Sequence, residues 1–325
     1  MFIFVTNLEE KSIFICDKIY LKGDVMNCSK WFKDFYDNLI IKDSIISAIT
    51  EGVEEISEII NFEYWNKNSR TDNVKLIGSL SRSTSIDTSK VEVMAILPHY
   101  MYKRYYLYSG NGPFSLVEDV YIRIKKTFIE ARIIKEGNRV EFTYKNVNFQ
   151  VIPAFIGEDE IYTYPETSMG GSWLSQDFDK SLEVFNKRDD EMKGNMKKFA
   201  KMLRVWNRNF NCRLSEILLD AIVYEFFENY SFGKIRGFAY FDLYFADFFK
   251  YLLKRGPEYY WYIPGTTISI NPRSPYLLNK KVKESLDITK KAIDLYLDEY
   301  ILLARDQWEL LFGDKFLEHK DFNIE

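Results

Sequence analysis

The clearest pattern in the chain is a helical spacing of apolar residues in its N-terminal third. Apolar side chains recur every three or four residues from Trp31 to Tyr36 and again from Ile40 to Trp65. The second segment carries a stripe made of Ile45, Ile46, Ile49, Val53, Ile56, Ile59 and Ile60. This spacing predicts an amphipathic helix that packs one face on a core. The polar residues 66–73 are expected to form a loop.

The next apolar segments are short and typical of strands. Val91–Leu97 is one, Val140–Tyr144 alternates apolar and polar residues, and Val147–Phe155 follows after a Lys-Asn turn. The last two therefore predict a hairpin. A helix is predicted between the strands, over residues 116–132. Strands and helices mixed in this way predict an α+β module with a mixed sheet.

The start of that intervening helix has a capping signature. Ser115 is predicted as its N-cap, and Glu118 three residues later completes a capping box.

The character of the chain changes after Gly170 and Gly171. Helical patterns follow at residues 182–208, 215–230, 240–254 and 284–312. The sequence therefore predicts an N-terminal extension (residues 1–29), an α+β domain (30–170) and a mainly helical lobe (171–325).

Composition narrows the class of protein. The chain has 325 residues, 46% of them hydrophobic, and a formal net charge of −4, which disfavours a protein that coats nucleic acid but allows a local basic cleft. Three scattered cysteines and two histidines predict neither a disulfide framework nor a zinc site. No run approaches the roughly 18 apolar residues of a membrane span. The opening Met1–Val5 is too short for a secretory signal. A cytoplasmic protein that does not enter a membrane is expected.

The chemistry is concentrated in residues 77–97. Gly78 and Ser79 form a Gly-Ser turn, in which glycine permits close backbone approach and successive N–H groups bind an anion. Arg82 and Thr84 follow, so the turn predicts a phosphate site that uses all four residues. Two positions on the strand behind it, Lys90 and Glu92, share one face.

Five motifs in order then resemble the bacterial cyclic-oligonucleotide synthases called CD-NTases (SMODS-type), relatives of oligoadenylate synthase and cyclic GMP-AMP synthase. They are Asn61–Trp65 at the end of the spine helix, Gly78–Thr84 at the phosphate turn, Val151–Phe155 in the third motif strand, Met202–Asn207 in a helix of the second lobe, and Trp308–Asp314 at the close. The resemblance implies a nucleotidyltransferase palm with an N-terminal spine helix and a mixed sheet, packed with a helical C-terminal lobe.

The resemblance also implies a two-metal site, which this chain does not match. The family holds two divalent ions with three carboxylates, and the corresponding positions here are Lys90, Glu92 and Gln150. A protonated lysine has no lone pair for Mg²⁺, which prefers anionic oxygen. No metal is therefore expected unless Glu92 holds one, and Mg²⁺ or Mn²⁺ is needed only if the chain is active. Asp87 and Glu141 are the acids considered as substitutes.

Several of these residues have two interpretations. Lys90 either replaces the charge of a metal and holds a phosphate, or has a structural role, with a buried stem and a solvated head or a salt bridge to Glu92. Arg204 occupies the family's triphosphate-binding position, or lies on the surface. Trp173 lines a base pocket, or packs in the core.

A basic helix face is a further candidate site. Its residues are Lys193, Lys197, Lys198 and Lys201. This face is either solvated, or binds RNA or a ligand phosphate.

The sequence is compatible with two main functions. The first is a catalytically impaired member of the family that acts in antiphage signalling. It would bind a nucleoside triphosphate (NTP) or an oligonucleotide, or an RNA or regulatory protein partner. The second is an active synthase of cyclic or linear oligonucleotides with an atypical metal site. The residues at the carboxylate positions favour the first.

Overall fold

The computed structural model describes residues 25–316, except 88, 108–110, 169, 229, 231–236 and 257–259, and the side chains from Cys28 onward. Most of the predicted N-terminal extension and Cys16 lie outside these residues. Residues 41–186 and 264–267 form one compact unit, here the palm unit. Residues up to 40, 187–263 and those from 268 onward form the other, here the helical unit. The domain boundaries expected from sequence character stay a prediction.

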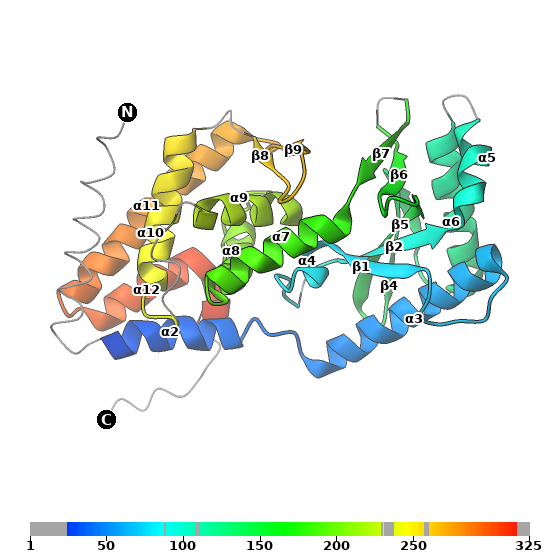
Figure 1. Cartoon of the computed structure of the whole chain (residues 1–325). Coiled ribbons are helices and arrows are strands. Elements are labelled where there is room, and N and C mark those ends of the chain that lie inside the picture. The colour runs from blue at the N-terminus through cyan, green and yellow to red at the C-terminus, as the bar shows by residue number, and fades with distance from the viewer. Residues whose placement is uncertain are drawn as a thin grey trace. The chain divides into compact units, whose positions relative to one another are not determined.

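The palm unit contains a mixed sheet, as the sequence predicts, and this sheet has seven strands where the sequence predicted three (Figure 1). Its strands are β1 (Val74–Ile77), β2 (Val91–Leu97), β3 (Ile134–Glu136), β4 (Arg139–Tyr144), β5 (Val147–Ile156), β6 (Tyr162–Glu166) and β7 (Ser172–Gln176). The order is β1-β2-β5-β4-β3, and β6 pairs with both β5 and β7. Strands β2 and β5 are parallel, and the other pairs are antiparallel.

Helices of the palm unit lie on both faces of the sheet. They are α3 (Asp43–Trp65), α4 (Gly78–Ser81), the 3-10 turn η1 (His99–Met101), α5 (Tyr102–Tyr106), α6 (Gly112–Thr127) and α7 (Phe178–Glu191), whose last residues belong to the helical unit. The main core lies between α3 and α6 and the face that carries Val93 and Val151. On the opposite face, Phe178 of α7 packs with Met94 and Ile152. The predicted β4–β5 hairpin is confirmed: Lys145 and Asn146 have φ of 47° and 64°, the left-handed conformation of a two-residue turn.

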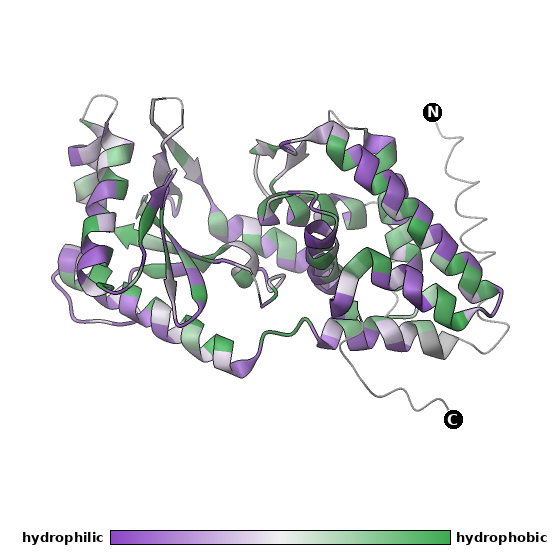
Figure 2. Ribbon diagram, turned by 180° about the vertical axis from the view of Figure 1, so that it is seen from behind, coloured by the Kyte–Doolittle hydropathy of each residue, from purple (hydrophilic) through white to green (hydrophobic). Residues whose placement is uncertain are grey.

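Helix α3 buries the predicted apolar stripe, and hydrophilic and hydrophobic residues alternate along it in Figure 2. A Cβ at Gly52 would lie 2.2 Å from Cζ of Phe149, so this glycine lets α3 approach β5 closely. The predicted stripe is wrong at Ile46, whose side chain is 48% exposed. At 100° per residue, Ile46 lies at the edge of the stripe, in the first turn.

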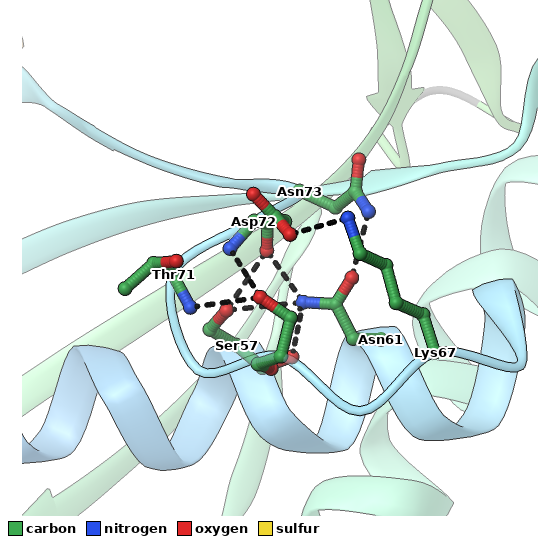
Figure 3. A network of polar contacts seen from close by, with 7 residues as sticks. Ser57, Asn61, Lys67, Thr71, Asp72 and Asn73 are labelled. Carbon is green, nitrogen blue, oxygen red and sulfur yellow. Dashed lines mark hydrogen bonds and ion pairs between the residues drawn. The ribbon is translucent and has the colours of Figure 1, made fainter.

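A buried polar network fixes the loop between α3 and β1 (Figure 3). The amide of Asn61 donates to the carbonyls of Ser69 and Asp72 at 3.2 and 2.7 Å, and its oxygen accepts from Asn73 at 2.7 Å. The hydroxyl of Ser57 donates to the same Asp72 carbonyl at 2.8 Å. These bonds set where the chain enters β1, and therefore position the turn that follows it.

The predicted capping box is wrong. Helix α6 begins at Gly112, with Asn111 as N-cap and Pro113 in the first turn, and ends at Thr127. The backbone N–H of Ser115 donates to the Asn111 carbonyl at 2.8 Å, so Ser115 is already inside the helix. Proline starts the helix early because its φ is preset for the first turn.

The helical unit contains the predicted helices, two of them divided. Its elements are α2 (Val25–Asp37), α8 (Asn195–Asn209), α9 (Glu216–Glu228), α10 (Phe241–Arg255), α11 (Pro275–Leu297), α12 (Ile301–Phe312), the 3-10 turn η3 (Gly313–Phe316) and the small hairpin β8 (Trp261–Tyr262) and β9 (Ser269–Ile270). Gly194 and Glu299, with φ of 79° and 69°, stand at the two breaks. A left-handed residue ends the hydrogen-bond pattern of a helix, so the apolar periodicity continues while the helix does not.

Aromatic residues form the core of the helical unit. The ring of Phe32 in α2 packs edge-on against Trp308 at 5.0 Å, and Phe35 packs against Phe312 at 4.7 Å. The closing motif therefore joins the last helix to α2. In the part of the chain that the structure describes, no helix is long and apolar enough to cross a membrane.

Candidate functional site

Two of the predicted site residues meet directly in the sheet. Glu92 of β2 is in register with Gln150 of β5, and Gln150 is in register with Glu141 of β4. Residues opposite one another on neighbouring strands lie on one face. We call these three residues the Glu92 row. They lie on the sheet face of Met94 and Ile152, opposite the face that α3 covers.

Lys90 reaches the far end of this row. Its Nζ lies 3.3 and 3.2 Å from the two carboxylate oxygens of Glu141, and its side chain is 50% exposed. Because β5 lies between β2 and β4, the lysine side chain spans β5 to reach Glu141. The salt bridge expected with Glu92 is therefore wrong, and Glu141, expected only to approach, is the partner.

Gln150 is buried and is bonded on both sides of its amide. Its Nε2 donates to Oε1 of Glu141, and its Oε1 accepts from Nη1 of Arg139 at 3.0 Å. Arg139 was not singled out from the sequence. The signal was its position two residues before Glu141, which places both on one face of β4.

Glu92 packs against the predicted phosphate turn. A Cβ at Gly78 would lie 1.8 Å from Oε2 of Glu92, and Gly78 has φ of +70°. Glycine is required here both by the left-handed backbone and by the nearby carboxylate. The Glu92 carboxylate thus lies at the β1 side of the row, while Lys90 reaches the β4 side.

We expect Gly78→Ala to destabilise the protein by about 1–3 kcal/mol, because it adds left-handed strain and a steric clash. Chemical unfolding measures this effect. In the double variant Gly78→Ala/Glu92→Ala the clash disappears, so the two costs should not add. Strictly additive costs would show that the carboxylate does not contact the turn.

The rest of the turn is buried and tightly bonded. The backbone N–H of Thr84 donates to the Ser79 carbonyl at 2.9 Å, and the guanidinium of Arg82 lies over the Phe185 ring at 6.0 Å. Ser79 is 1% exposed, and its hydroxyl has no hydrogen-bond partner in the described part of the chain. Buried polar atoms normally have a partner, so this hydroxyl is an available ligand for a bound group.

Arg204 belongs to the helical unit and is not on the surface. Its Nη2 lies 2.9 Å from Oδ1 of Asp220, and the two side chains are 3% and 0% exposed. Nη1 also donates to the Ala200 carbonyl at 3.4 Å. The structure therefore gives Arg204 a buried ionic partner inside its own unit.

Trp173 packs on the other face of the sheet. Its ring lies edge-on to Tyr102 at 5.2 Å and 6.0 Å from Phe155, against the core under α6. The structure does not bring it to the Glu92 row, and we do not carry it into the proposed site.

The basic face of α8 is only partly solvated. Lys197 lies 3.7 Å from Asp189, and Lys198 lies over the Phe238 ring at 5.3 Å. Burial, together with nearby Arg204, lowers the pKa of Lys201.

The donor set of the Glu92 row does not fit a two-metal site. It offers one carboxylate at Glu92, an amide already bonded on both sides, and a carboxylate held by an ammonium. Divalent Mg²⁺ needs anionic oxygens in near-octahedral geometry. Within the described ranges, no group of three or more His, Cys, Asp or Glu is placed to hold a metal ion.

The mixed sheet, the α3 spine and the Gly-Ser turn before β2 define a nucleotidyltransferase fold. Residues 26–189, about half of the chain, match the Second Messenger Oligonucleotide or Dinucleotide Synthetase (SMODS) domain, and the chain belongs to this family. A curated relative, a probable cyclic nucleotide synthase of Bacillus cereus (strain VD146), is 23% identical over 210 residues. That match covers 61% of this chain and 59% of the relative.

Solved structures support the same fold. CdnC of E. coli MS115-1, in complex with HORMA-deltaN, has a TM-score of 0.63 at 13% identity, over 89% of this chain and 98% of that one. CdnG of Bradyrhizobium diazoefficiens, a CD-NTase in complex with GTP, has 0.64 at 8% identity, over 90% and 96%. The Vibrio cholerae cyclic AMP-GMP synthase DncV, with a linear intermediate, has 0.57 at 11% identity, over 96% and 91%. The predicted CD-NTase family and α+β fold are therefore confirmed.

Proposed function

We propose that this chain binds a nucleotide or oligonucleotide through its phosphates without two-metal nucleotidyl transfer, and that it acts as a regulatory CD-NTase in antiphage signalling. The observation that carries this proposal is the sheet register. It places Glu92 beside Gln150, while the Lys90 ammonium lies 3.2 Å from Glu141. This arrangement supports the proposal because a positive charge and an amide stand at two of the three positions where the family resemblance implies carboxylates.

Phosphate binding itself is supported by the groups around the turn. Ser79 offers a buried hydroxyl, and Lys90 keeps half of its side chain exposed. Both lie on the palm unit, at the two sides of Glu92. Among the similar structures, CdnC is described with ATP and CdnG with GTP, which suggests nucleotides as first ligands to test. Hydrogen bonds to charged groups are the stronger ones and need no metal.

The test is calorimetry with NTPs and short oligonucleotides, with and without excess chelator. We expect binding to survive the chelator. Lys90→Ala should weaken it roughly ten- to a hundred-fold, since a lost charged hydrogen bond costs ~1.5–3 kcal/mol.

The matched control is Lys145→Ala. Lys145 is also 50% exposed and also pairs with a glutamate, Glu51, elsewhere in the palm unit. A strict Mg²⁺ requirement, or equal effects of the two substitutions, would refute the proposal.

A second candidate function rests on Glu141. It lies on the face of Glu92, one strand beyond Gln150, so two carboxylates flank the amide. If both held metal ions, the chain would be an active synthase of cyclic or linear oligonucleotides. Incubation with the four labelled ribonucleotides and Mg²⁺ or Mn²⁺ decides between them, because phosphatase-resistant product would establish catalysis.

A partner protein or RNA is part of this proposal. The E. coli CdnC structure contains a HORMA partner, so a regulatory protein is a reasonable class of partner to seek here, in the cytoplasm. Pull-down from cells that carry the neighbouring genes tests it.

A further inference from the structure

Four side chains of the Glu92 face, from Lys90 to Arg139, form one continuous chain of contacts. Lys90 binds Glu141, Gln150 donates to Glu141, and Arg139 donates to Gln150 at 3.0 Å. A cation therefore stands at each end of this chain. Lysine has three N–H donors and arginine five, so both retain donors for a ligand. The Nε of Arg139 is buried and has no hydrogen-bond partner among the residues described.

The charge of this face is small. Three cations and three carboxylates lie at the turn, the row and the adjoining end of β3: Arg82, Lys90, Arg139, Glu92, Glu136 and Glu141. Lys75 on β1 and Asp179 on α7 form an ion pair with each other and add no net charge. We call this surface the palm face; its charges cancel, so it offers no excess positive charge to a highly charged ligand.

An NTP does not match this charge. It carries roughly four negative charges at neutral pH, because its terminal phosphate is doubly ionised. In a two-metal site the divalent ions offset this charge. Here the phosphates would instead lie near Glu141, whose side chain is only 15% exposed, and near Glu92. Repulsion between like charges is strong where water is partly excluded.

A phosphodiester matches this face more closely than an NTP does. Each phosphodiester carries one negative charge and two non-bridging oxygens, which one lysine or arginine can bind. We infer that the palm face recognises the phosphodiester of a short cyclic or linear oligonucleotide in preference to an NTP, with Arg139 and Lys90 as its cations. This inference rests on the proposed function, and it makes the chain a receptor for the products of nucleotidyl transfer.

The experiment is calorimetry in excess chelator with three kinds of probe. They are 3′,5′-cyclic dinucleotides of adenine and guanine, the linear dinucleotides ApA and GpG without terminal phosphates, and ATP and GTP. We expect at least one dinucleotide to bind about tenfold or more tightly than either NTP. Which dinucleotide binds separates a cyclic source from a linear one.

Two variants test whether the charges of the palm face cause this preference. Arg139→Ala should weaken dinucleotide binding by about tenfold, while Lys145→Ala should not. Glu141→Gln removes one carboxylate with little change of shape, so it should tighten ATP binding by roughly tenfold and reduce the preference for dinucleotides. The second variant keeps the test valid if Arg139→Ala does not fold.

The outcomes are distinct. Tighter binding of an NTP than of every dinucleotide, or a preference unchanged by Glu141→Gln, would overturn this inference and leave metal-free phosphate binding standing. If no probe binds, the proposed function fails as well.

Discussion

Asp220→Asn is expected to destabilise the protein by about 3–5 kcal/mol, because it removes the buried carboxylate that pairs with the guanidinium of Arg204. The carboxylate and the guanidinium are 2.9 Å apart, and their side chains are 0% and 3% exposed. Bringing a charge out of water is costly unless a partner offsets it. Chemical denaturation of the parent and the variant measures the difference directly.

Two controls define this result. Asp37→Asn removes an exposed partner of Lys33 in the same unit and should cost only about 0–1 kcal/mol. Arg204→Met/Asp220→Leu replaces the whole pair with apolar side chains and should recover much of the lost stability. If Asp220→Asn costs no more than Asp37→Asn, Arg204 is solvated and is open to a phosphate after all.

The double variant Lys90→Asp/Gln150→Asp is expected to create a divalent metal site. It places two new carboxylates beside Glu92 and opposite Glu141, which restores the anionic oxygens that Mg²⁺ and Mn²⁺ prefer. Without metal, clustered like charges should lower the melting temperature. With Mn²⁺ at 100 times its dissociation constant, binding should return about 2.7 kcal/mol of stability.

Thermal unfolding across a Mn²⁺ titration measures both effects. Adding Glu92→Gln to the double variant should abolish the response, because the central carboxylate is lost. Lys145→Asp/Gln150→Asp, which places one acid elsewhere, is the matched control. A double variant that responds to Mn²⁺ no more than the parent would show that these positions do not correspond to the family's metal ligands.

Sequence reasoning succeeded where the signal is local. Alternation and a Lys-Asn turn gave β4 and β5 their hairpin, and the apolar spacing gave α3 its buried face. The order of motifs, from the Gly78 turn to the closing Trp308 helix, was enough to identify the family. Short strands such as β1 and β3 were missed because three or four residues carry too little periodicity.

The sequence predicted the candidate site only in part, because the contacts between its side chains depend on segments that are distant in the chain. The sequence named Lys90, Glu92 and Gln150, because their positions relative to the turn and strands are local facts. It did not show that Lys90 crosses β5 to reach Glu141, or that Arg139 bonds Gln150. Those contacts depend on which strands are neighbours and in what register, and the pairing of distant segments is not encoded in any single segment.

What the sequence by itself determined is therefore the family, the helices and strands with strong periodicity, and the residues Lys90, Glu92 and Gln150 that it proposes for the family's carboxylate positions. Tertiary structure alone decided which side chains lie beside these residues and which lie elsewhere. Arg204 shows the difference: its place on an amphipathic helix was visible, but its burial against Asp220 was not. A charged side chain is stable inside a protein only where packing places a partner group beside it. That partner often comes from a distant segment, so its position is known only from the folded chain.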